Sequence, residues 1–339
     1  MVSAYARWMD RWETRLANRD FNRVERPFEW GLDWMDLPEG EGKDVRDAVR
    51  ARTAGWLAGS EAFYSYKRPT DYRMVDGHLT FTSPLETPYP ENNRVHADLY
   101  PADQDLGRAV VVLPQWNADQ QGHANLCRLL NRFGITALRM SMAYHDRRRP
   151  PETARADYHV SSNIGRTIHA ARQSVIDTRA CLDFLEMHGY DRLGLLGTSL
   201  GSCIAFMAAA HDPRVKAAAL NHVSMYFGDV VWTGLSTRHV QRGLSQEVSQ
   251  DELRDYWAVI SPASYLDRLV GRDLPVLLVW TSCDTTFLPV YSRQVVEAFH
   301  QLGLKHEERK LPCGHYTLGQ FPFNIVDGLT LCYFLARKL

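Results

Sequence analysis

The five residues from Gly197 to Gly201 read Gly-Thr-Ser-Leu-Gly, a G-x-S-x-G pattern whose serine has the chemistry of a nucleophile. A chain of this length holds such a pattern by chance about one time in ten, so its surroundings decide its meaning. The pattern follows a strand predicted at Arg192–Leu196 and precedes a helix predicted at Ser202–Ala210. In a sharp strand-turn-helix connection, glycines avoid Cβ clashes and the serine hydroxyl rises above the carboxyl edge of the sheet. The sequence therefore predicts that Ser199 is a nucleophile, and a serine that only caps the helix is the alternative.

A serine nucleophile needs a histidine base and an acid that orients this base, and the sequence offers both in a suitable order. Asp284 lies in a loop after the apolar strand predicted at Pro275–Trp280, and His315 lies in a Pro-Cys-Gly-His-Tyr loop before the last helix. Each of the three residues follows a successive core strand, which predicts that they meet at one edge of the sheet. Asp229 is the alternative acid. His306 is a weaker alternative base, because it lies at the beginning of its strand.

Attack on a carbonyl group also requires N–H donors for the oxyanion that forms. We expect one donor to be the backbone N–H of Leu200, the residue after the nucleophile. The second donor is expected in the loop after the strand at Ala109–Leu113, from the backbone N–H of Gln115 or Trp116. The sequence does not distinguish between these two, and a packing role for the Trp116 side chain is compatible with both.

The elements that would position these residues alternate between strands and helices from about His78 to the C-terminus. Continuous apolar runs such as Ala109–Leu113 are typical of strands that are covered on both faces. A long helix is predicted where apolar residues recur at three- and four-residue steps between Ile168 and Leu185. This alternation predicts an α/β fold with a mostly parallel central sheet and helices on both faces. Further strands are expected at 78–82, 94–99, 135–140, 215–220 and 306–311, and a closing helix near 319–335.

Two segments fall outside this alternation. Residues 1–75 are rich in tryptophan and charge and have weak strand signals, which predicts an N-terminal helical extension. This extension is expected to pack on the main domain, residues 76–339, or on a second subunit in a homo-oligomer. Residues 224–269 have mixed helical and loop character and are predicted to be an insertion within that domain.

The overall composition argues against several classes of partner. The 339-residue chain has a formal net charge of -1, so neither nucleic acid nor a membrane surface is an expected partner. The N-terminus lacks the apolar stretch of a secretory signal, and no window approaches the ~18 apolar residues of a membrane-spanning helix. A cytoplasmic location is therefore expected. The six cysteines lack metal-ligand spacing and are expected to be free thiols, although Cys283 and Cys313 lie close to predicted site residues.

Taken together, the Gly197–Gly201 turn, the Cys283-Asp284-Thr285 loop and Gly314-His315 resemble the α/β-hydrolase superfamily over roughly residues 78–339. The Tyr-His-Asp-Arg-Arg stretch from Tyr144, followed later by the Gly-Thr-Ser-Leu-Gly turn, looks like the dienelactone-hydrolase-like and peptidase-like esterase branches. One departure is Pro114-Gln115, which stands where this superfamily usually has His-Gly before the oxyanion loop.

The resemblance implies attack by Ser199, an acyl-enzyme intermediate, and hydrolysis by a water that His315 activates, with no metal or organic cofactor. It also implies that the 224–269 insertion is a cap over the site. The candidate contacts for a small-molecule ester-like substrate are then Tyr144, His145, Tyr226 and Trp232. Structural roles for these four aromatic side chains are the alternative.

The function that the sequence favours is hydrolysis of a carboxylic ester by a serine nucleophile. A thioesterase, an amidase or a carbon–carbon bond hydrolase with the same three residues is the first alternative. A non-catalytic protein of this fold that binds a ligand or another protein is the second, and the presence of all three catalytic groups argues against it.

Overall fold

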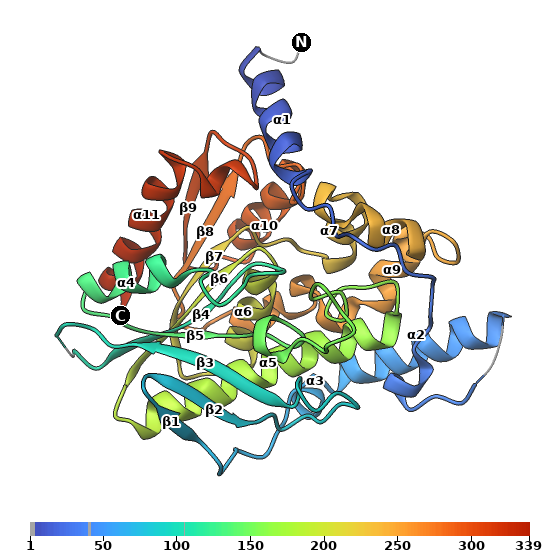
Figure 1. The fold of residues 1–339 in the computed structure, drawn as a ribbon, viewed down its shortest axis with the longest axis horizontal. Helices are drawn as coiled ribbons and strands as arrows, with labels where there is room; N and C mark the ends of the chain where they lie inside the picture. The colour runs from blue at the N-terminus through green and yellow to red at the C-terminus, as the bar shows by residue number, and fades with distance from the viewer. Residues whose placement is uncertain (1–3, 40–41, 105) are drawn as a thin grey trace.

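One sheet runs through the whole molecule in the computed structural model, which describes residues 4–39, 42–104 and 106–339 (Figure 1). Within these residues the sheet has nine strands in the order β1-β2-β3-β5-β4-β6-β7-β8-β9. The strands are β1 (Arg73–Val75), β2 (His78–Thr82), β3 (Arg94–Tyr100), β4 (Arg108–Leu113), β5 (Thr136–Met140), β6 (Arg192–Thr198), β7 (Val215–Asn221), β8 (Val276–Thr281) and β9 (His306–Leu311). The pairs β1–β2, β2–β3 and β3–β5 are antiparallel and the other five pairs are parallel, which confirms the expected α/β fold with a mostly parallel sheet.

Helices cover both faces of this sheet (Figure 1). The α-helices are α1 (Ala4–Ala17), α2 (Gly42–Ala58), α3 (Ser60–Phe63), α4 (Ala124–Arg132), α5 (Ile164–Met187), α6 (Leu200–His211), α7 (Phe227–Thr233), α8 (Arg238–Leu244), α9 (Gln250–Tyr256), α10 (Pro289–Gln301) and α11 (Phe323–Lys338). The 3-10 helices are η1 (Leu32–Met35), η2 (Asp146–Arg148), η3 (Leu235–Thr237), η4 (Ala258–Ile260), η5 (Pro262–Leu269) and η6 (Thr317–Gly319). None of the helices in the described part of the chain is long and apolar enough to cross a membrane.

The two faces of β4 explain why its sequence is apolar at every position from Ala109 to Leu113. Val110 and Val112 pack into the cluster formed with α4 and α11. Val111 and Leu113, on the opposite face, pack into the larger cluster formed with α5, α6 and α10. Because successive side chains of a strand point to opposite faces, burial on both sides requires a continuous apolar run.

The strands expected from the sequence are present, with ends that differ by at most two residues from those predicted. Strand β1 was not expected, because it lies within the segment predicted to be helical and has only three residues. It pairs with β2, so the sheet begins at Arg73, before the boundary proposed at residue 75. The insertion at 224–269 consists of α7 to α9 and η3 to η5.

The N-terminal segment packs against the rest of the chain and contributes to the same hydrophobic core. Met35, Val45, Val49 and Phe63 are buried in one cluster with residues of α5 and α6. Helix α1 lies at the edge of the molecule, beyond the ends of β8 and β9 (Figure 1), and its Met9 is buried in the second hydrophobic cluster.

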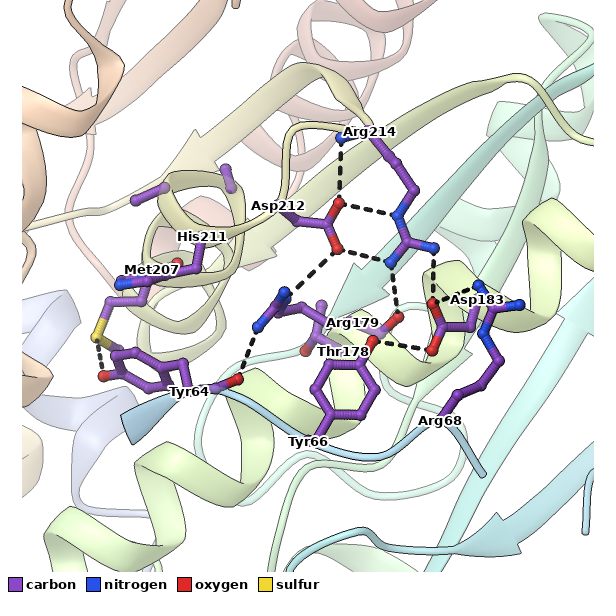
Figure 2. Close-up of polar contacts among 12 residues, drawn as sticks. Tyr64, Tyr66, Arg68, Thr178, Arg179, Asp183, Met207, His211, Asp212 and Arg214 are labelled. Carbon is purple, nitrogen blue, oxygen red and sulfur yellow. Dashed lines mark hydrogen bonds and ion pairs between the residues drawn. The ribbon is translucent and has the colours of Figure 1, made fainter. Parts of the chain in front are cut away.

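A polar network next to this core ties the segment after α3 to α5 and to the turn that follows α6 (Figure 2). Arg214 bonds the carboxylates of Asp212 and Asp183 at 2.7 and 2.6 Å, and Tyr66 Oη donates to Asp183 at 2.9 Å. Arg179 donates to the backbone oxygen of Tyr64 at 2.7 Å. The N-terminal segment is thus held by hydrogen bonds as well as by apolar packing.

Candidate active site

Ser199 lies in the turn between β6 and α6, with φ 56° and ψ −120°, a backbone conformation that few side chains adopt. The two glycines of the pattern are required by close approach. A Cβ on Gly197 would lie 2.3 Å from the backbone oxygen of Gly201, and a Cβ on Gly201 would lie 2.1 Å from that of Leu113. This strained turn projects the serine from the carboxyl end of a central strand, as the sequence predicts.

The structure brings Ser199, His315 and Asp284 into one hydrogen-bonded chain. Ser199 Oγ lies 3.1 Å from His315 Nε2, and His315 Nδ1 lies 3.2 Å from Asp284 Oδ2. The other carboxylate oxygen, Oδ1, accepts backbone N–H bonds from Thr286 and Phe287, both at 2.7 Å. The Phe287 ring stacks on His315, with ring centroids 5.5 Å apart. The imidazole is therefore oriented by a fixed carboxylate on one side and an aromatic ring on its face.

The charges around the hydrogen-bonded residues Ser199, His315 and Asp284 favour an ionised Asp284. Burial alone would raise the pKa of Asp284, but His315 and then His222 outweigh it and lower this pKa below its ordinary value. Burial alone would lower the pKa of His315, but the Asp284 carboxylate outweighs it and raises this pKa above its ordinary value. The acid thus stabilises the imidazolium form, which is the form a base adopts after it takes a proton.

A second histidine, which the sequence analysis did not identify, lies against the same carboxylate. His222 directly follows β7 and has φ +63°, and its Nδ1 lies 2.9 Å from Asp284 Oδ2. Burial lowers the pKa of His222, although Asp284 partly opposes this effect. The position of His222 after a core strand was the one signal in the sequence that could have indicated it.

A second residue that the sequence did not indicate comes from the N-terminal helix. Glu13, on α1, is fully buried against the loops that carry Asp284 and His315. No pattern in the sequence marks it, because 304 residues separate it from one of its partners, Thr317.

The alternative acid and base lie elsewhere. Asp229 is buried in α7 and bonds Arg254 at 2.6 and 3.0 Å and Gln250 at 2.8 Å. His306, at the start of β9, has its Nδ1 2.9 Å from the backbone oxygen of Leu304. Both side chains contact these other groups, so neither takes part in the hydrogen bonds that link Ser199, His315 and Asp284.

The predicted oxyanion donors lie close to the serine. Leu200 is the first residue of α6, where a backbone N–H has no acceptor within the helix. Gln115 and Trp116 line the same cavity as Ser199, in a loop where Asn117 has φ +62°. The indole N–H of Trp116 donates to the backbone oxygen of Ala156 at 3.0 Å, which fixes the side chain as a packing element. The role of these backbone N–H groups as donors stays a prediction.

Two cavities meet at Ser199. The larger one has a volume of about 930 Å³, and its wall includes Asn221, His222, His315 and Tyr316. The smaller one has a volume of about 40 Å³ and is lined mainly by apolar side chains, among them Leu200, Cys203, Phe227, Val230, Val231 and Phe287. Ser199 thus lines both a wide, mixed polar cavity and a small apolar one.

The four side chains predicted to contact a substrate are absent from the walls of both cavities. Tyr144 is fully buried, with its ring packed against Tyr89 and Tyr158. His145 is also buried and its Nδ1 contacts the backbone oxygen of Ala143 at 2.8 Å.

The other two belong to the insertion. Tyr226 lies under the guanidinium of Arg254, and Trp232 packs against the main core. The contact with Arg254 and the packing on the main core therefore account for these two aromatic residues, and none of the four side chains lines either cavity.

The thiols next to the site do not form a disulfide. Cys283 and Cys313 are free, and their loops are joined by a hydrogen bond of 2.9 Å from the N–H of Cys283 to the oxygen of Cys313. His222, Asp284 and His315 offer ligand atoms within 4.8 Å of one another, so a metal ion bound there would share two residues with the hydrogen-bonded chain.

Comparison with known proteins finds the same fold in solved structures. The family model described as "Alpha/beta hydrolase domain containing 18" matches residues 119–272. No curated protein matches the sequence. Acetyl xylan esterase 1 from a Thermoanaerobacterium species is similar in structure, with a TM-score of 0.58 at 14% identity over 95% of this chain and 98% of that chain. Acetyl xylan esterase from a Paenibacillus species gives 0.57 at 15% identity over 91% of this chain and 99% of that chain.

Acylaminoacyl peptidase from Pyrococcus horikoshii has a TM-score of 0.60 at 14% identity, over 80% of this chain and 42% of that chain. This chain thus spans less than half the length of that peptidase. At these identities the solved structures show a shared fold, and the narrower esterase branches suggested by the sequence stay a prediction. The chain thus shares its fold with these hydrolases, and residues 119–272 match the α/β-hydrolase family model.

Proposed function

We propose that the protein is a serine hydrolase that cleaves a carboxylic ester through an acyl-enzyme intermediate. The observation that supports this proposal most strongly is the hydrogen-bonded chain from Ser199 Oγ through His315 to Asp284, with contacts of 3.1 and 3.2 Å, at a strained turn that places the serine in the cavity wall. A binding protein of the same fold would have no need of all three groups in this order. A cytoplasmic location, as expected from the sequence, is part of the same proposal.

The reaction follows from the positions of these atoms. His315 Nε2 takes the proton of Ser199 as Oγ attacks the ester carbonyl, and Asp284 stabilises the imidazolium that forms. The backbone N–H of Leu200 and a second N–H from Gln115 or Trp116 donate to the oxyanion. His315 then gives its proton to the departing alcohol, which leaves an acyl group on Ser199. A water that His315 deprotonates attacks this acyl group and regenerates the serine.

The two cavities support a division of the ester between a short acyl group and a larger alcohol. The apolar cavity of about 40 Å³ beside Ser199 has room for little more than an acetyl or propionyl chain. The cavity of about 930 Å³ on the other side admits a larger, partly polar leaving group. Solved structures that share this fold include two acetyl xylan esterases, which is consistent with a small acyl group.

Labelling and turnover test the proposal together. A fluorophosphonate probe should label the wild-type protein and leave Ser199→Ala unlabelled. With p-nitrophenyl acetate, Ser199→Ala should lower kcat by something like 10⁶-fold, the typical loss for such a nucleophile. The value of kcat/KM should fall from acetate to octanoate, because a long chain exceeds the apolar cavity.

Three results would contradict the proposal in different ways. A wild-type protein that is neither labelled nor active on any ester would indicate a non-catalytic binding protein. Labelling with faster turnover of a matched acyl thioester or amide would retain the serine nucleophile and replace the ester as substrate. A preference for octanoate over acetate would remove the assignment of the small cavity to the acyl group.

A further inference from the structure

Glu13 is a buried carboxylate that the proposed chemistry does not use directly. It lies on α1, and its side chain is fully buried. One carboxylate oxygen accepts the backbone N–H of Thr317 at 2.6 Å. The other accepts the backbone N–H of Tyr316 at 3.1 Å and the hydroxyl of Thr285 at 3.3 Å. A buried carboxylate with this many donors is fixed in position, because loss of any of them leaves a buried charge poorly solvated.

The donors belong to the two loops that carry the residues next to the serine. Tyr316 and Thr317 directly follow His315, and Thr285 directly follows Asp284. The three segments converge at Gly314, where a Cβ would lie 2.3 Å from the carboxyl carbon of Glu13 and 2.6 Å from the backbone oxygen of Cys283. The carboxylate therefore occupies the space that a side chain at position 314 would need.

We propose that Glu13 is a positioning residue that joins the His315 loop to the Asp284 loop, so that the N-terminal helix is part of the active-site architecture. The catalytic consequence rests on the proposed hydrolase function. The positioning itself concerns the orientation and charge state of His315 and does not depend on which bond is cleaved.

Other contacts of the N-terminal residues converge on the same loop. Tyr5 Oη donates to the backbone oxygen of Pro312. The hydroxyl of Thr317 contacts the sulfur of Met9 at 3.3 Å, and Arg23 donates to Tyr316 Oη at 3.0 Å. Helix α1, which stands at the edge of the molecule in Figure 1, is therefore seated on the segment that presents His315.

The charges around His315 give the proposal a measurable signature. Asp284 faces it from the loop after β8, His222 from the loop after β7, and Glu13 from α1. Beyond its neighbour Tyr316 lie Arg23, Arg155 and Asp20. Burial lowers the pKa of His315, and Asp284 and then Glu13 raise it. Removal of the negative charge at position 13 should therefore lower the pKa of this histidine.

The test compares Glu13→Gln, which keeps the shape and removes the charge, with Asp10→Asn, which removes an exposed charge from the same helix. Turnover of p-nitrophenyl acetate is measured against pH and expressed per site titrated with a fluorophosphonate. For Glu13→Gln we expect kcat to fall about 10- to 100-fold with KM changed by less than about threefold, because the loops lose their alignment. The acid limb of the pH profile should move to lower pH. Asp10→Asn should match the wild-type protein in each quantity.

A purely structural role would lower the midpoint of thermal unfolding while kcat per titrated site and the acid limb stay as in the wild type, and that result overturns the proposal. If Glu13→Gln does not fold, Glu13→Asp keeps the charge with a shorter reach. It should lose kcat with an acid limb close to that of the wild type, and wild-type kcat in this variant would equally overturn the proposal.

Failure of the proposed function is recognised separately, since the wild type would then be neither labelled nor active. In that case the pKa of the His315 imidazole is measured by NMR titration in the wild type and in Glu13→Gln. A lower midpoint in Glu13→Gln supports the positioning role, and an unchanged midpoint overturns it.

Discussion

At the scale of single residues, the Asp284 carboxylate is the centre of the site. Its Oδ1 is held by two backbone N–H groups, and its Oδ2 faces both His315 and His222. Only one of these imidazoles reaches Ser199. Burial lowers the pKa of His222, whereas Asp284 raises the pKa of His315. The two histidines thus share one acid but their pKa values shift in opposite directions, which is consistent with the proposed role of His315 as the base.

This difference predicts the pH dependence of the reaction. A base must be neutral to accept a proton, and the ordinary pKa of histidine is about 6.5. Because Asp284 raises the pKa of His315, the acid limb of kcat/KM in the wild-type protein should lie above about pH 6.5. In Asp284→Asn, burial still lowers the pKa of His315, and the carboxylate that raises this pKa is absent. The limb should move below that value, and kcat should fall by something like the ~10⁴-fold loss known for this change in serine proteases.

Asp229→Asn is the matched control, because Asp229 is also buried and was the alternative acid, but it pairs with Arg254. Its acid limb should coincide with that of the wild type. An acid limb in Asp284→Asn at the wild-type position would mean that this carboxylate does not set the charge state of His315.

At the scale of elements, the turn from β6 to α6 depends on close packing against the end of β4. The missing Cβ of Gly201 leaves room for the backbone oxygens of Leu113 and Pro114, which lie 2.1 and 2.6 Å from where that atom would be. Neither is the end of a flexible side chain, so the backbone itself would have to move. The turn at Ser199 therefore depends on how β4, β6 and α6 pack together, and not only on its own local conformation.

Gly201→Ala should therefore lower the free energy of unfolding by about 3 kcal/mol or more, in the range of changes that force a backbone shift. Gly55→Ala is the control, because Gly55 is exposed in α2 and has nothing within 4 Å of the added atom. It should stabilise the protein by up to about 1 kcal/mol through helix propensity. Urea denaturation of both variants measures the two effects. Equal stability of Gly201→Ala and the wild type would show that the turn is looser than its distances indicate.

The elements also show what the sequence could and could not predict. The strands and the order of Ser199, Asp284 and His315 were predictable, because apolar runs and the carboxyl ends of core strands follow local rules. Glu13 was not, since its partners lie about 300 residues away and depend on how α1 packs. Tyr144 was assigned to the substrate from a resemblance, whereas its ring fills an interior aromatic cluster. Side-chain direction after a strand is set by tertiary packing, which no local pattern contains.

At the scale of the whole molecule, the N-terminal segment and the rest of the chain share one core. Apolar residues of α2 and α3 are buried with those of the sheet and of α5, and polar contacts reinforce the same junction. Asp183 is central there, because it accepts from Tyr66 at 2.9 Å and pairs with Arg214 at 2.6 Å (Figure 2). Units that share a core in this way are expected to unfold together.

Asp183→Asn should therefore destabilise the whole chain as one unit. Loss of charged hydrogen bonds at a buried site should cost about 1–3 kcal/mol, while Asp191→Asn, with 83% of its side chain exposed, should cost less than about 0.5 kcal/mol. Tryptophan fluorescence reports mainly on the first 75 residues, which hold five of the nine tryptophans, and far-ultraviolet circular dichroism reports on all elements. Both signals should give one thermal transition with the same midpoint, shifted equally by Asp183→Asn. A fluorescence transition that precedes the loss of secondary structure would mean that residues 1–75 fold as a separate extension.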